Sequence, residues 1–250
     1  MIAEVSRKEL EDRGIVHDVE LRVVPTGFRA PWYEALEGVE RADPEHYRRL
    51  LEALVADPAR NAIAVDLACA EAAQEETVLV FSIRVEHCRL LRADVARREP
   101  RVGLLVGEAS AGVEDDFEAT RQGLAAGAIR VGVGTYQAAG TGVDLPSVSR
   151  GICTTPIHTN RQFFGQVRGR ICRIDRSAGA EKRDAKLFYL WDEKIHGLSA
   201  LRNLTGWTRR SLVLVGGAWV DARVWLREQE AANEAKQERR EWYPGDVGGG

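Results

Sequence analysis

Residues 166–173 read Gln-Val-Arg-Gly-Arg-Ile-Cys-Arg, inside a segment that predicts a helix over residues 160–173. Arg170 and Arg173 are three positions apart, so a helix places them on one face. A guanidinium presents a planar fork of donors and stays charged at any working pH, which suits it to phosphate groups. Two of them on a rigid helix fit a triphosphate. The competing interpretation is an Arg-rich helix that only faces solvent.

A glycine-rich loop precedes this helix. Residues 135–146 read Thr-Tyr-Gln-Ala-Ala-Gly-Thr-Gly-Val-Asp-Leu-Pro and follow a strand predicted at residues 129–133. Gly140 and Gly142 permit positive φ or close approach of the backbone to a ligand. Thr135 and Thr141 place hydroxyl groups beside these glycines, where phosphate oxygens are typical partners. A plain glycine-rich turn is the alternative for this loop.

The elements around these segments alternate between strands and helices. Short apolar runs predict strands at residues 78–81, 102–106, 129–133 and 187–191, with another inside 147–154. Helices are expected between them, and Asp43-Pro44 and Asp57-Pro58 each start a further helix well. This order predicts an α/β fold with a parallel sheet flanked by helices. In such sheets ligands collect at the carboxyl ends of the strands.

In order and spacing, the loop at 135–146 and the helix at 166–173 resemble motifs five and six of superfamily 2 helicases. The resemblance implies a RecA-like sheet and, specifically, the second of the two lobes that form such a motor. It also implies roles for the matching positions. Gln166, Arg170 and Arg173 would face ATP, the two arginines as arginine fingers. Gly142 and Asp144 would help to bind the nucleotide, and Thr135 and Thr141 would contact nucleic-acid phosphates.

The same resemblance extends upstream. Residues 78–82, Val-Leu-Val-Phe-Ser, resemble motif four, whose strand end contacts the nucleic-acid backbone, so Ser82 is a candidate contact. Gly107 matches the glycine that begins the loop after the next strand, and it is a second candidate. Arg121 falls where a helix arginine often follows that loop. One departure stands out: Ala139-Gly140-Thr141-Gly142 replaces the Ala-Arg-Gly turn of the DEAD-box branch. The chain looks more like phage or restriction-type helicases, which favours DNA over RNA as the partner.

Two motifs of a complete motor are missing from the sequence. A phosphate loop needs Gly-Lys followed by Ser or Thr, and the chain contains no Gly-Lys dipeptide. Asp192-Glu193 follows an apolar run, but its position after motif six favours an ordinary strand exit over an acidic box. The chain alone is therefore not expected to hydrolyse ATP. ATP with Mg²⁺ would bind only in a complete site shared with a first lobe that carries both motifs.

Besides a motor lobe, two other classes of function stay open at this point. One is a non-catalytic nucleic-acid-binding or regulatory remnant of a helicase. The other is an enzyme that acts on small molecules and is built on a similar sheet.

The amino-acid composition does little to separate these three classes of function. The net charge is −3 and the pI about 6.0, so any nucleic-acid binding must come from a local patch. Four cysteines without a C-x-x-C pair predict a reduced, cytoplasmic protein with no metal site. No apolar run is long enough to span a membrane.

We expect three parts along the chain. Residues 1–75 form an N-terminal lead-in strand and helices packed on the lobe, and residues 76–195 form the RecA-like core. Residues 196–250 form a C-terminal extension, with a hairpin at 211–224, a charged helix at 225–241 and a frayed tail. Four tryptophans in this extension are expected to pack it onto the core.

Overall fold

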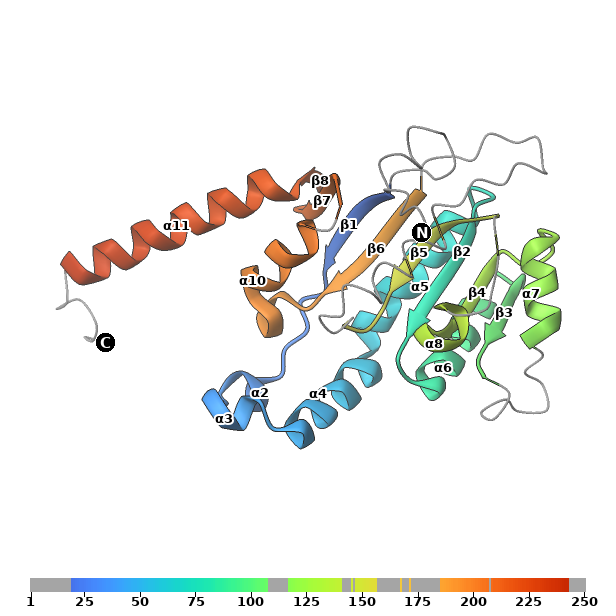
Figure 1. Ribbon diagram of the computed structural model, residues 1–250, viewed down its shortest axis with the longest axis horizontal. Coiled ribbons are helices and arrows are strands. Elements are labelled where there is room, and N and C mark those ends of the chain that lie inside the picture. The colour runs from blue at the N-terminus through green and yellow to red at the C-terminus, as the bar shows by residue number, and fades with distance from the viewer. Residues whose placement is uncertain are drawn as a thin grey trace, which may run out of the picture.

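The computed structural model describes residues 19–107, 117–140, 145, 147–156, 167, 171, 185–206 and 208–242. Within them, an eight-stranded sheet forms the centre of the molecule (Figure 1). Its strands are β1 (Val19–Pro25), β2 (Thr77–Ser82), β3 (Val102–Leu105), β4 (Val131–Thr135), β5 (Val148–Cys153), β6 (Ala185–Trp191), β7 (Arg210–Val215) and β8 (Ala218–Asp221).

The strand order in the sheet is β3-β4-β2-β5-β6-β1-β7-β8. Neighbouring strands from β3 to β7 pair in parallel, and only β7 and β8 pair antiparallel, as the predicted hairpin requires. The parallel α/β class predicted from the alternation is confirmed. All the parallel strands end at one edge, which we call the carboxyl edge.

Helices cover both faces of this sheet. They are α2 (Pro31–Glu34), α3 (Gly38–Arg41), α4 (Pro44–Ala56), α5 (Pro58–Ala72), α6 (Val85–Ala96), α7 (Phe117–Ala125), α8 (Tyr136–Gly140), α10 (Glu193–Thr205) and α11 (Ala222–Trp242). The two predicted Asp-Pro starts are confirmed. The Asp43 carboxylate accepts from the Glu45 amide at 2.8 Å, and the Asp57 carboxylate accepts from the Arg60 amide at 2.7 Å.

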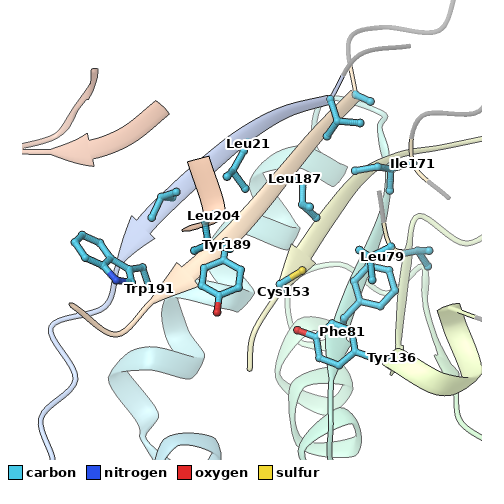
Figure 2. Close-up of a cluster of buried hydrophobic side chains, with 14 of the residues drawn as sticks. Leu21, Leu79, Phe81, Tyr136, Cys153, Ile171, Leu187, Tyr189, Trp191 and Leu204 are labelled. Carbon is cyan, nitrogen blue, oxygen red and sulfur yellow. The ribbon is translucent and has the colours of Figure 1, made fainter. Parts of the chain in front are cut away.

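The strands bury different residues on each face, because successive side chains of a strand point to opposite sides. One face packs Leu79, Phe81, Leu187 and Tyr189 against residues that include Val167 and Ile171 (Figure 2). There the Phe81 and Tyr136 rings stack with centroids 5.6 Å apart. The other face buries Val78, Val80, Ile152, Phe188 and Leu190 beneath α5 and α6.

The strand near the start of the chain lies inside the sheet. β1 is hydrogen-bonded to β6 on one side and to β7 on the other, so it joins the predicted core to the predicted C-terminal extension. Five of its seven residues are buried. The three parts expected from the sequence thus share one continuous sheet, while their division stays a prediction.

A small separate core lies beyond the carboxyl ends of β1 and β6, where Figure 1 shows α2, α3 and α4. Phe28, Tyr33, Leu50 and Leu54 form it together with Ile195 from α10. The sequence predicted no helix over these residues, so α2 and α3 were missed. Both are four residues long, too short to show a helical period.

Several boundaries differ from the prediction. β4 spans Val131–Thr135 rather than 129–133, and it contains Gly132 and Gly134. A Cβ at Gly134 would lie 2.4 Å from the Leu105 carbonyl oxygen, so only glycine allows the two backbones to approach this closely. Helices α8 and α10 were also missed, and β8 ends at Asp221, three residues earlier than expected.

The tail packs onto the sheet as expected. Trp219 lies edge-on to Phe188, with ring centroids 6.4 Å apart, and Trp225 lies edge-on to Trp191 at 6.0 Å. Beyond this contact α11 extends away from the sheet (Figure 1).

Candidate functional site

The carboxyl edge brings together the candidate residues that lie in the described part of the chain. Ser82 and Thr135 are direct partners in the register of β2 and β4. Gly107 lies two residues beyond the end of β3, whose Leu105 pairs with Gly134. Three positions separated by up to 53 residues in the sequence therefore meet at one edge, as a parallel sheet requires.

Thr135 ends β4 and starts α8. Its hydroxyl oxygen accepts a hydrogen bond from the Ala138 amide at 3.1 Å, which caps the first turn of this short helix. The side chain is half-buried, so part of it faces outward. The Tyr136 hydroxyl, on the next residue, donates to the Thr155 carbonyl oxygen at 2.8 Å and ties α8 to the end of β5.

Gly107 lies in open surroundings. Within the described part of the chain, a Cβ added there would meet no atom within 4 Å. Packing against the described residues therefore does not explain the glycine, and none of them blocks the approach of a ligand backbone to this position.

Ser82 is fully buried, unlike the other two candidates. Its Oγ lies 2.9 Å from Nδ1 of His87, and His87 Nε2 lies 2.8 Å from Oδ1 of Asn61. The hydroxyl thus faces the interior, where it belongs to a polar chain running to α5.

Arg84 is a residue at this edge that the sequence reasoning missed. It stands immediately before α6, two residues after the end of β2, and is half-exposed. Most described arginines of the neighbouring helices have carboxylate partners, such as Arg89 with Glu86 and Arg97 with Asp94. In the residues that the structure describes, the Arg84 guanidinium has no ion pair. The signal in the sequence was a cation directly after a buried strand.

All the predicted nucleotide residues lie outside the described residues: Gln166, Arg170, Arg173, Gly142 and Asp144. The predicted nucleic-acid contact Thr141 lies outside them as well. Two neighbours of the arginines are described: Val167 and Ile171 are both helical and fully buried in the core beside Leu187 and Cys153. These two positions of the predicted helix are thus packed against the sheet.

A second buried cluster stands at the same edge, at the end of β6. Asp192 is 1% exposed and binds the fully buried Arg60, with Oδ1 2.8 Å from Nε and Oδ2 3.2 Å from Nη2. The Thr26 hydroxyl also donates to Asp192, at 2.6 Å. Asp192-Glu193 is therefore an ordinary end of a strand, because the Asp192 carboxylate is engaged in a buried ion pair with Arg60.

Two described cysteine thiols, those of Cys88 and Cys153, are expected to be unreactive at neutral pH. Burial raises the pKa of the Cys88 and Cys153 thiols to about 12, so both stay protonated at neutral pH. Among the described residues, no group of three or more His, Cys, Asp or Glu side chains is placed to hold a metal ion. None of the described helices is long and apolar enough to cross a membrane.

No protein-family model matches the chain, and no curated protein matches it either. The structure itself matches solved structures of larger proteins, among them UvsW, an HsdR subunit and Dbp5. The chain has a RecA-like fold.

Three of these structures illustrate the match. UvsW of T4 aligns with a TM-score of 0.59 and 12% identity, over 79% of this chain and 41% of UvsW. A fragment assigned as the HsdR subunit of a type I restriction enzyme from Vibrio vulnificus YJ016 aligns with a TM-score of 0.55 and 19% identity, over 85% and 39%. A variant of S. cerevisiae Dbp5 bound to RNA and ADP BeF3 gives 0.52 and 12%, over 92% and 48%. This chain thus spans less than half the length of each of them.

Proposed function

We propose that the chain is the second motor lobe of an ATP-dependent nucleic-acid helicase or translocase, and that its carboxyl edge contacts the nucleic-acid backbone. The observation that carries the proposal is the pairing of Ser82 with Thr135, with Gly107 at the same edge. These are the positions that the helicase motifs assign to backbone contacts, and the sheet around them has the matching fold. DNA is the preferred partner because of the departure from the DEAD-box turn.

The contacts at this edge suit phosphates rather than bases. Thr135 presents a half-buried hydroxyl, Gly107 leaves its surroundings open, and Arg84 adds a positive charge. Hydroxyl and guanidinium groups donate to phosphate oxygens and carry little sequence information. Because the net charge of the chain is −3, such binding depends on this local patch. We expect weak affinity that falls steeply with salt.

The nucleotide would bind on the side of the arginine helix. Two guanidinium groups, an amide and a carboxylate, from Arg170, Arg173, Gln166 and Asp144, form a donor set that fits a triphosphate and a ribose. With Val167 and Ile171 buried as anchors, the helix would be held rigidly enough to aim these side chains. Bound ATP with Mg²⁺ supplies the phosphoryl group whose hydrolysis drives such motors. The arginines would stabilise negative charge on it, which is the usual role of fingers.

Binding and turnover assays test the proposal separately. The full chain is titrated with a fluorescent oligo(dT) strand at several salt concentrations. We expect Thr135→Val and Arg84→Ala each to weaken binding, while Arg92→Ala does not. Arg92 is an exposed arginine two turns further along α6, which makes it a matched control. Indifference of the binding to salt, or equal loss in all three variants, contradicts the contact surface.

ATP turnover is measured for the chain alone and mixed with a RecA-like lobe that carries a phosphate loop and an acidic box. We expect no turnover from the chain alone, and DNA-stimulated turnover from the mixture. Salt-dependent DNA binding without any effect on a first lobe would instead favour a non-catalytic binding module.

A further inference from the structure

A buried chain of hydrogen bonds links the first turn of α5 to the end of β2. It runs from Asn61 through His87 to Ser82, and these side chains are 4%, 3% and 0% exposed. Asn61 Oδ1 lies 2.8 Å from His87 Nε2, and His87 Nδ1 lies 2.9 Å from Ser82 Oγ. Asn61 is anchored in turn, since its Nδ2 donates to the Val55 carbonyl oxygen at 2.9 Å.

The chemistry of the partners fixes the direction of every bond in this chain. The Asn61 amide nitrogen is used on Val55, so its oxygen faces His87 and can only accept. His87 Nε2 therefore carries a hydrogen. Burial and the nearby Arg60 cation lower the pKa of His87 to about 3, so the ring is neutral and Nδ1 is an acceptor. The Ser82 hydroxyl must then donate to His87.

The consequence for Ser82 is that its proton is already used. The only remaining capacity of the hydroxyl is to accept, and the Arg84 amide donates to it at 3.2 Å. The neighbouring Ile83 amide donates to the Thr155 hydroxyl oxygen at 3.1 Å. Both amides of the turn between β2 and α6 are thus held by side chains, and the turn has a defined shape from which the Arg84 side chain leaves.

We infer that Asn61, His87 and Ser82 are positioning residues that act through Arg84, by fixing the turn that presents its guanidinium to a nucleic-acid phosphate. The inference rests on the proposed function, and it changes the role of Ser82 from a contact to a support. It also makes the start of α5, which belongs to the predicted lead-in, part of the nucleic-acid site.

A histidine in this place does more than fill space. A phenylalanine would fill a similar volume, but it would leave Ser82 Oγ and Asn61 Oδ1 without their partner. Both ends of the ring meet groups of the required polarity, and the last bond of the series ends on the backbone of Arg84 itself. The position of the charge therefore depends on a residue 23 positions upstream, Asn61.

A double-mutant cycle in the full chain tests this dependence. Binding of oligo(dT) is measured across a salt series for Ser82→Ala, Asn61→Ala and Arg84→Ala. It is also measured for the two double variants that combine Ser82→Ala or Asn61→Ala with Arg84→Ala. We expect Arg84→Ala to weaken binding about tenfold at low salt and to reduce the salt slope by about 0.7, the loss of one phosphate contact to a single strand. Ser82→Ala and Asn61→Ala should each weaken binding about threefold or more and lower the same slope. In the Arg84→Ala background they should have no further effect.

The outcomes separate the inference from the proposed function. If Ser82→Ala and Asn61→Ala weaken binding equally with and without Arg84, they act on folding alone, and the inference is overturned. If both variants bind like the unmodified chain while Arg84→Ala binds more weakly, the inference is also overturned, but the proposed function stands. Absence of any oligo(dT) binding by the unmodified chain overturns both. Arg92→Ala is the control that must leave affinity and slope unchanged.

Discussion

Helix α5 begins at the carboxyl edge of the sheet and ends at the opposite edge, where the parallel strands begin and which we call the amino edge. A buried arginine is held differently at each. At the amino edge, Arg150 of β5 meets Glu71 at 2.6 Å and Glu76 at 2.9 Å, and its third nitrogen donates to the Ser149 carbonyl oxygen at 3.1 Å. At the carboxyl edge, Arg60 meets Asp192, and its Nη1 is buried with no hydrogen-bond partner in the described part of the chain.

Under the proposed function, the difference separates a structural edge from a functional one. At the amino edge all three guanidinium nitrogens of Arg150 are bonded among the described residues, so this arginine is fully used by the structure. Arg130, at the same edge, keeps a buried Nε without a described partner, but its other two nitrogens bind Glu75. Among the described residues, the carboxyl edge carries a buried Arg60 donor without a partner, an Arg84 guanidinium without an ion pair, and a turn held by side chains. Buried polar groups are normally bonded to protein or to ordered water, so such a donor marks a place where strain, a water or a ligand is expected. The following predictions test this contrast, beginning with the largest effect.

Arg170 and Arg173 of the helix predicted at 160–173 should affect turnover and leave stability unchanged. In a complex completed by a first lobe, Arg170→Ala or Arg173→Ala should each lower ATP turnover about 10³-fold or more, the scale known for arginine fingers. Lysine substitutions should restore little, because a point charge cannot reproduce the guanidinium fork. Thermal unfolding should hardly change, since arginines that face a ligand, as the finger role requires, contribute little to stability. A well-folded double variant with normal turnover would falsify the finger role.

Arg150 should give the opposite result. Arg150→Met leaves Glu71 and Glu76 buried without their cation, and breaking a buried pair in this way costs about 3–5 kcal/mol. Urea unfolding measures the loss. Adding Glu71→Gln and Glu76→Gln should recover part of it, because the uncompensated charges disappear. Oligo(dT) affinity of the folded fraction should stay unchanged; a specific loss of binding would show that the amino edge is not purely structural.

Local signals in the sequence explain why the framework of this contrast was predictable and its details were not. The apolar runs at β2 and β3 and the Asp-Pro starts of α4 and α5 act over a few residues, so they were predicted at nearly the right positions. The insertion of β1 between β6 and β7 depends on pairing across more than 160 residues, for which periodicity carries no information.

The site shows the same limit. Strand ends could be located, so Ser82, Gly107 and Thr135 were placed on one edge. The partners that decide what each side chain can do are distant: Arg60 and Asp192 are separated by 132 residues, and Asn61 and His87 by 26. Ser82 was chosen as a contact because its burial and its bond to His87 were invisible in the sequence. Arg84 was passed over because nothing local shows that an arginine is unpaired.

Acid should weaken the carboxyl edge through His87. The folded pKa is about 3 and the ordinary value is 6.5, so between these limits the unfolded chain binds a proton that the folded chain excludes. The stability due to neutral His87 is complete above pH 6.5 and is lost as the pH falls toward 3, at about 1.4 kcal/mol per pH unit.

The measurement is urea unfolding at several pH values for the unmodified chain and for His87→Phe, which cannot titrate. The slope of unfolding free energy against pH should differ between the two proteins by about 1.4 kcal/mol per pH unit below pH 6.5, and the difference should vanish above it. Parallel curves throughout the range would mean that His87 accepts a proton in the folded protein below pH 6.5, where Ser82 could then no longer donate to Nδ1.

The smallest effect is expected at Arg121, which follows Gly107 along the chain and was considered from the motif pattern. Its guanidinium is bound to Glu118 of the same helix turn, at 2.6 and 2.8 Å, and the pair is exposed. Exposed pairs of this kind are screened by water and salt, so Arg121→Ala should not measurably shift the unfolding midpoint. Because Glu118 already neutralises the charge, the variant should also bind oligo(dT) as the unmodified chain does, in contrast to Arg84→Ala. If Arg121→Ala did reduce the salt slope of binding, the ion pair must open to meet a phosphate, and the functional edge would extend from β2 to α7.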